Sequence, residues 1–137
     1  MDRRLFLTGS LLATLTLPGH SALAATPDHP RIALIFVGAS WCPVCHAAAA
    51  VLAPMAVRSG IDVLVASQDG KPIAPWPACV DARGHRLAAS VTAIPTLLFV
   101  DLVAGRAIAE LPGFSDPRQY IGSIRRILRA ATETGHG

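Results

Sequence analysis

The feature that most constrains the fold is an apolar run, Ile32–Val37, which leads through a short turn into a Cys-x-x-Cys motif at Cys42 and Cys45. An unbroken apolar run of this length is typical of a strand buried on both faces, as in the middle of a parallel or mixed sheet. The alanine-rich stretch after the motif has helical character, and Pro43 suits the first helical position, where its missing N–H costs nothing. Two cysteines at a strand-to-helix junction indicate a redox-active dithiol.

The junction predicts different chemistry for the two thiols. Cys42 is the candidate nucleophile, because the free amides and the dipole at a helix N-terminus favour the thiolate and lower the pKa of the thiol. Cys45, one turn further into the helix, is the candidate resolving thiol, which attacks the mixed disulfide and releases the reduced partner. A purely structural disulfide is the alternative for this pair.

The rest of the chain predicts a strand–helix–strand unit followed by a hairpin and a final helix. The helix after Cys42 is expected to kink or end at Pro54, and Ser59-Gly60 closes the segment. Parallel strands end at the same edge of a sheet, so the long loop Ser67–Val80 is expected on the edge that carries Cys42, as a surface loop or a groove wall. The other expected elements are strands over Ile61–Ala66, Thr96–Val100 and Arg106–Leu111, a short helix over Gly84–Val91, and a helix from Asp116 to Ala131.

Residues 1–24 are predicted to be an export signal. A basic start, Met1–Arg4, precedes the mainly apolar Leu5–Leu17, and Ala22-Leu23-Ala24 has the small-residue pattern of a cleavage site. The apolar stretch is too short for a normal membrane span, which favours a signal peptide cleaved after Ala24 over a permanent anchor. Arg3-Arg4 also resembles a twin-arginine signal. We therefore predict a periplasmic location.

Composition limits the remaining possibilities. A chain of 137 residues has room for one domain, which we place at residues 25–131 with a polar tail at 132–137. With 52% hydrophobic and 15% charged residues, disorder is expected only at the ends of the chain. The net charge of +3 is too small to predict a nucleic-acid partner. The basic residues near the C-terminus are predicted to lie on a solvent-exposed helix face: Arg125, Arg126 and Arg129.

With these landmarks the chain resembles the thioredoxin superfamily over roughly residues 31–131. The resemblance is carried by Trp41-Cys42-Pro43-Val44-Cys45, by Ile94-Pro95-Thr96 before the hairpin and by Gly113 before the last helix. The first motif looks most similar to the periplasmic TlpA-like and DsbE (cytochrome c maturation) thioredoxins. The resemblance implies an α/β fold of the minimal thioredoxin-like type, βαβ–ββα, with a mixed four-stranded sheet and flanking helices. Few residues precede Ile32, so the first strand and helix of full-length thioredoxin are expected to be missing.

The resemblance also implies roles around the thiols. Pro43 and Val44 would tune the redox potential, and a cis bond before Pro95 would let the Ile94 backbone pair with an extended substrate chain. Trp41 would either flank the thiols as an apolar wall for a substrate peptide or be a core aromatic. The implied partners are exported proteins with disulfides or dithiols, together with a membrane thiol electron donor that keeps the dithiol reduced. Oxidation of folding proteins stays open as the opposite direction, and no cofactor is implied.

One position departs from the thioredoxin pattern. Thioredoxin has a buried acid on the strand six residues before the first cysteine, and Phe36 stands at that place here. The acid that aids proton transfer to the second cysteine is therefore absent, and a proton relay must use water or another group.

Two other chemistries compete for the same residues. Cys42-Pro43-Val44-Cys45-His46 fits the c-type haem attachment pattern, although Met55, the one Met after the predicted signal, is poorly spaced for an axial ligand. A copper or zinc module could use Cys42, Cys45 and His46, with His85 as a fourth ligand. In the dithiol reading, His46 is a polar residue in the first helical turn that modulates the thiols electrostatically. Cys79 is expected to be either a buried small apolar residue or a third redox thiol.

Overall fold

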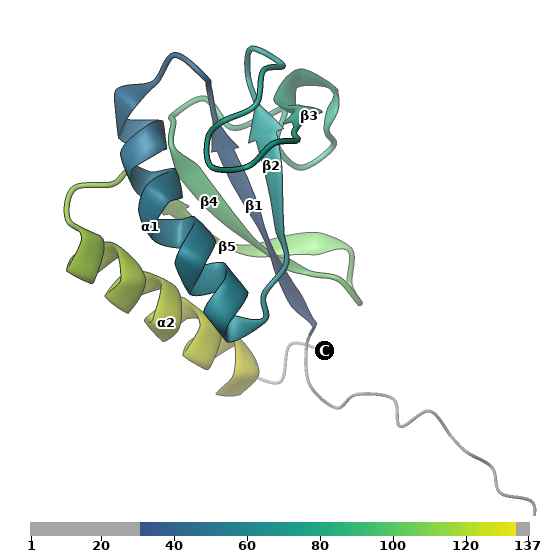
Figure 1. Ribbon diagram of the computed structural model, residues 1–137. Helices are drawn as coiled ribbons and strands as arrows, with labels where there is room; N and C mark the ends of the chain where they lie inside the picture. The colour runs from purple at the N-terminus through teal and green to yellow at the C-terminus, as the bar shows by residue number, and fades with distance from the viewer. Residues whose placement is uncertain (1–30, 134–137) are drawn as a thin grey trace, which may run out of the picture.

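A computed structural model describes residues 31–133, which form a mixed five-stranded sheet in the order β3-β2-β1-β4-β5 with two α-helices (Figure 1). β1 pairs in parallel with β2 and antiparallel with β4, so the first helix is the crossover of a βαβ unit. The α/β class and the βαβ–ββα order are thereby confirmed. The predicted export signal and the cleavage site after Ala24 lie outside the described residues. The elements are β1 (Ile32–Gly38), α1 (Pro43–Ser59), β2 (Val63–Ser67), β3 (Val80–Asp81), β4 (Thr96–Asp101), β5 (Arg106–Pro112) and α2 (Pro117–Glu133).

The sheet has one strand more than the four that were predicted. The additional strand, β3, pairs in parallel with β2 in the register Ala66↔Val80 and Ser67↔Asp81. Both of its residues are exposed, so no alternation of apolar and polar side chains marks it in the sequence. It forms because the long loop after β2 returns along the sheet edge and finds free backbone groups there.

Helix α1 begins and ends as predicted but passes through its proline. Pro43 is its first residue, and Gly60 follows its last residue in the left-handed conformation, with φ 66°. Of the two outcomes expected at Pro54, the helix end does not occur, because α1 continues to Ser59. Pro54 and Ala50 both lie on the exposed side, so the Ala50 carbonyl, which loses its helical partner, is open to water.

The sheet buries both of its faces, by different means. Helices α1 and α2 cover one face over Leu34, Phe36, Leu97 and Phe99, and this core includes both cysteines of the motif. The opposite face packs under the segment between β3 and β4, through side chains that include Ala82 and Ala88. The helix predicted over Gly84–Val91 is wrong: a short 3₁₀ helix, Ala82–Gly84, is followed by turns.

The side chain of His85 explains why this segment stays a turn. Its Nδ1 accepts backbone N–H bonds from Leu87 and Ala88, at 3.2 and 3.3 Å, so these amides are satisfied locally. Ala88 and Ala89 also donate to the His85 carbonyl, at 3.1 and 2.9 Å, which closes a single turn. The segment thus covers the sheet without a regular helix.

The hairpin and the last helix follow the sequence signals closely. Asp101 is buried, and its Oδ1 accepts the N–H groups of Val103 and Ala104 in the turn between β4 and β5. Asp116 caps α2 by accepting the N–H of Gln119 at 2.9 Å. The helix runs on to Glu133, so it takes in the start of the predicted polar tail. Within residues 31–133 no helix is long and apolar enough to cross a membrane.

Candidate active site at the N-terminus of helix α1

Cys42 lies at the N-cap position of α1, directly after the turn that leaves β1. Its backbone is extended, with φ −90° and ψ 110°, and its Sγ accepts the backbone N–H of Cys45 at 3.1 Å. Its own N–H donates to the Ala39 carbonyl at 3.2 Å, which closes the turn. The sulfur therefore occupies the place where a side-chain oxygen normally caps a helix, and a negative charge there is stabilised by the N-terminal amides.

Cys42 and Cys45 form a disulfide with a Cα–Cα distance of 5.2 Å. Cys42 retains 6% of its exposure and Cys45 none, so the outer sulfur of the pair belongs to Cys42. The order of accessibility is the one predicted for a nucleophile and a resolving thiol. The structure thus brings the two predicted catalytic cysteines together, whereas their roles in exchange stay predictions.

Gly38, which sequence reasoning missed, makes room for the inner sulfur. A Cβ on this glycine would lie 3.1 Å from Cys45 Sγ, 3.1 Å from Ile73 Cδ1 and 3.2 Å from Phe36 Cε1. The sulfur and these two apolar side chains thus border the same space beside Gly38, and one of the two, Phe36, occupies the position of the missing acid. A glycine between a buried strand and a Cys-x-x-Cys motif was the available signal.

The loop between β2 and β3 lies against the site. This agrees with the prediction that it forms a wall of the site, one of the two arrangements expected for this loop. Ile73 is fully buried beside Cys45, and the ring of Trp76 contacts that of Phe36 at a centroid distance of 5.3 Å. Cys79 is half-buried and packs against the same core, which fits a small apolar side chain. A redox role for Cys79 stays a prediction.

The segment Ile94-Pro95 meets the site at the same edge of the sheet. The antiparallel register pairs Val37 with Thr96, so this segment lies where β1 ends. The Ile94–Pro95 peptide bond is cis, as the resemblance implied, and Pro95 is fully buried while Ile94 is partly buried. The roles of Ile94 and Pro95 toward a substrate chain stay predictions.

Two apolar side chains beside the motif face solvent. Trp41 is 68% exposed and Val44 is 45% exposed. The alternative of Trp41 as a core aromatic is therefore wrong. Exposed aromatic and branched side chains of this kind suit contact with another chain, and their roles as substrate wall and redox-tuning residue stay predictions.

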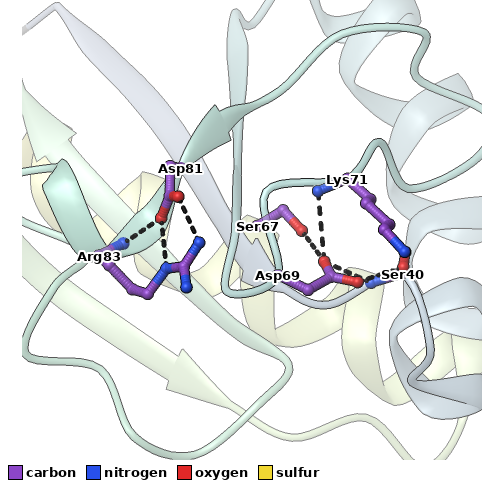
Figure 2. A network of polar contacts seen from close by, with 6 residues as sticks. All are labelled: Ser40, Ser67, Asp69, Lys71, Asp81 and Arg83. Atoms are coloured by element: carbon purple, nitrogen blue, oxygen red, sulfur yellow. Dashed lines mark hydrogen bonds and ion pairs between the residues drawn. The ribbon is translucent and has the colours of Figure 1, made fainter.

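A carboxylate that the sequence did not single out, Asp69, is hydrogen-bonded to the turn before Cys42 (Figure 2). Its Oδ1 accepts the N–H of Ser40 at 3.2 Å and the hydroxyl of Ser67 at 2.5 Å, and its Oδ2 accepts the hydroxyl of Ser40. The backbone N–H of Lys71 adds a longer bond of 3.4 Å. The hydroxyl of Ser40, followed by that of Ser67, holds the pKa of the Asp69 carboxyl well below its ordinary value.

His46 contacts the same turn from the helix side. Its Nε2 lies 2.6 Å from the Ser40 carbonyl oxygen, and because that oxygen can only accept, Nε2 is the donor. His85 lies on the opposite side of the sheet from the cysteine pair, among the side chains under the β3–β4 segment. Among residues 31–133 no group of three or more His, Cys, Asp or Glu side chains can hold a metal ion, so the four proposed ligands are not assembled.

A family model described as "TraF: F plasmid transfer operon protein" matches residues 21–109, more than half of the chain. The chain belongs to the TraF family. No curated protein sequence matches it significantly. The match spans the cysteine motif and the Ile94-Pro95 segment, so the residues assembled at the site lie within the family region of this TraF-family chain.

Solved thioredoxin structures resemble this TraF-family chain in fold. Thioredoxin from Fasciola hepatica matches with a TM-score of 0.52 and 19% identity, over 72% of this chain and 83% of that one. A mutant thioredoxin from Halobacterium salinarum matches with a TM-score of 0.54 and 18% identity, over 75% and 76%. The predicted thioredoxin-like fold is confirmed, and the closer likeness to TlpA-like and DsbE proteins stays a prediction.

Proposed function

We propose that this TraF-family chain is an exported thiol–disulfide oxidoreductase that reduces disulfides of periplasmic proteins through Cys42 and Cys45. The observation that carries the proposal is the placement of Cys42 Sγ, the outer sulfur of the pair, 3.1 Å from the Cys45 N–H at the start of α1. A thiolate is the attacking species in disulfide exchange, and this placement favours the thiolate.

The exchange follows from the geometry in two steps. In the reduced protein, Cys42 thiolate attacks one sulfur of the partner disulfide, which forms a mixed disulfide and releases the other partner sulfur as a thiolate. Cys45 then loses its proton and attacks Cys42 Sγ, which breaks the mixed disulfide and releases the second partner sulfur. Two electrons pass to the partner, and the protein is left with the Cys42–Cys45 disulfide, the state that the structure describes.

The surroundings of Cys45 distinguish its step from that of Cys42. Cys45 is fully buried in the same apolar core as Phe36 and Ile73. Burial of this kind penalises the charged thiolate, so deprotonation of Cys45 is expected to be slower than attack by Cys42. The mixed disulfide is therefore expected to be long-lived enough to trap.

Partner and compartment belong to the proposal as well. The exposed Trp41 and Val44, together with the partly buried Ile94, would contact the peptide around the partner disulfide. Export is supported by the sequence pattern of residues 1–24, and a membrane thiol donor would return the protein to the dithiol state. The direction of exchange depends on the redox potential, since about 30 mV changes the balance by about 1.4 kcal/mol.

Trapping tests the proposal directly. A Cys45→Ser variant, expressed with its signal, is expected to accumulate mixed disulfides with exported proteins, because the second step cannot occur. Cys42→Ser is expected to form none, and Cys79→Ser is the matched control that should behave like the unaltered protein. Equal trapping by Cys42→Ser and Cys45→Ser would rule out the assigned roles. A redox potential as high as that of strong oxidants would reverse the proposed direction.

A further inference from the structure

Ser40 is held from two sides. Asp69 accepts both its N–H and its hydroxyl, and His46 donates to its carbonyl at 2.6 Å. Ser40 shares the turn between β1 and α1 with Trp41 and Cys42, so a residue two positions before the nucleophile has its N–H, its hydroxyl and its carbonyl engaged. Asp69 lies 29 positions further along the chain, which makes its bonds tertiary contacts between two loops.

Asp69 differs from Asp81, the other carboxylate in Figure 2, in the sequence range of its hydrogen bonds. Asp81 bonds to the backbone and side chain of Arg83, two positions away, at 2.6 to 2.9 Å (Figure 2). That pair is local and exposed, whereas Asp69 joins the turn before Cys42 to the end of β2 through Ser67. We call the group formed by Ser40, Ser67, Asp69 and Lys71 the Ser40–Asp69 clamp.

We propose that Asp69 is a positioning residue for disulfide exchange, which holds Ser40 so that Cys42 Sγ stays at the N-terminus of α1. The proposal rests on the proposed function and adds a residue to its machinery. The direct effect is geometric: with the clamp closed, the turn cannot rotate Cys42 away from the Cys45 N–H. A displacement of about 1 Å at a reacting group can cost about a hundredfold in rate.

Charge and position predict opposite results, which makes the proposal testable. A negative charge near a thiolate disfavours it, so loss of the Asp69 charge alone would increase the thiolate fraction of Cys42. Loss of positioning would decrease that fraction, because the sulfur would leave the helix amides. Asp69→Asn removes the charge but keeps an oxygen for the three donors that Oδ1 accepts, whereas Asp69→Ala removes both.

The experiment measures the pH profile of Cys42 alkylation by iodoacetamide in the reduced protein. We expect Asp69→Ala and Ser40→Ala to lower the thiolate fraction at neutral pH by roughly tenfold and threefold, and Asp69→Asn to leave it unchanged or raise it. Ser40→Thr, which keeps the hydroxyl, is expected to rescue the profile. Asp81→Ala is the matched control and should leave the profile unchanged. Far-UV circular dichroism confirms that each variant is folded.

Two results would overturn the proposal. The first is an alkylation profile in Ser40→Ala and Asp69→Ala that equals the profile of the unaltered protein. The second is an equal increase of the thiolate fraction in Asp69→Ala and Asp69→Asn, which would show that only the charge of Asp69 matters. The profile requires only a reduced thiol and no partner protein. It can therefore fail while the trapping experiment succeeds, or succeed while trapping fails, so the two proposals are tested separately.

Discussion

Gly38 offers the sharpest test of how the fold supports the cysteine pair. In Gly38→Ala the added methyl group would meet Cys45 Sγ and Ile73 Cδ1 at 3.1 Å and Phe36 Cε1 at 3.2 Å. All three residues are fully buried, so none of them can move into solvent to relieve the contact. Overpacking of this kind costs about 1–3 kcal/mol, against about 0.4–1 kcal/mol gained because alanine restricts the unfolded chain. We expect a net loss of about 1 kcal/mol, near the middle of the range that these two effects allow.

The loss should depend on the redox state. In the oxidised protein the disulfide fixes Cys45 Sγ, whereas in the reduced protein the side chain is free to turn away from the new methyl group. The oxidised form is therefore expected to lose more stability, which makes the disulfide easier to reduce. A difference of about 1.4 kcal/mol between the two states corresponds to a redox potential about 30 mV higher.

Two measurements check this reasoning. Urea unfolding of both redox states gives the two losses, and equilibration with glutathione gives the potential. Gly122→Ala is the matched control, since a Cβ there meets nothing within 4 Å and alanine favours a helix, so a gain of about 0.5–1 kcal/mol is expected. Equal losses in both redox states with an unchanged potential would refute the argument that the sulfur limits the space.

Three further predictions concern the surface and the helix. Trp41→Ala is expected to lower kcat/KM for a protein disulfide by about tenfold while Tm stays almost constant, because the side chain is 68% exposed. A small disulfide compound should be reduced at an unchanged rate. A large fall in Tm would contradict the surface role of Trp41. Pro54→Ala should stabilise α1 by about 1 kcal/mol or more, because the Ala50 carbonyl regains its helical partner. The expected measurement is a rise of about 4–8 °C in Tm. An unchanged Tm would show that the proline does not destabilise the helix. The pKa of Asp69 is lowered in the folded state, so its contribution to stability is present above the ordinary pKa of 3.8 and is lost as the pH falls through the folded pKa. Urea unfolding between pH 5 and 2 should therefore show a smaller loss of stability on acidification for Asp69→Asn than for the unaltered protein. Parallel curves of stability against pH for the two proteins would argue against the clamp.

Local signals predicted most of the elements that place the cysteine pair. The apolar run before the motif became β1, Pro43 became the first residue of α1, and Gly60 ended that helix in the left-handed conformation. Each depends on residues a few positions apart, so the sequence pattern contains the necessary information. Strand β3 and the turns after it were not predicted, because their backbone bonds depend on the neighbouring strand and on His85.

The missed site residues share a physical cause. Gly38 matters because Ile73 and Cys45 approach it in space, and the former arrives from the loop after β2. Asp69 matters because the fold brings that same loop to Ser40. Neither contact follows a periodic pattern, and an aspartate in a polar loop looks the same in the sequence whether or not it bonds across the fold.

The sequence by itself determined that a Cys-x-x-Cys motif sits between a buried strand and a helix, which places Cys42 among free helix amides. Only the tertiary structure decided what surrounds that motif: apolar contacts at Cys45, a carboxylate hydrogen-bonded to the preceding turn, and an exposed Trp41. The physical reason is the distance along the chain between the residues that determine each feature. A helix start is set by neighbours in the chain, whereas the environment of a sulfur atom is set by whichever segments the folded sheet brings to one edge.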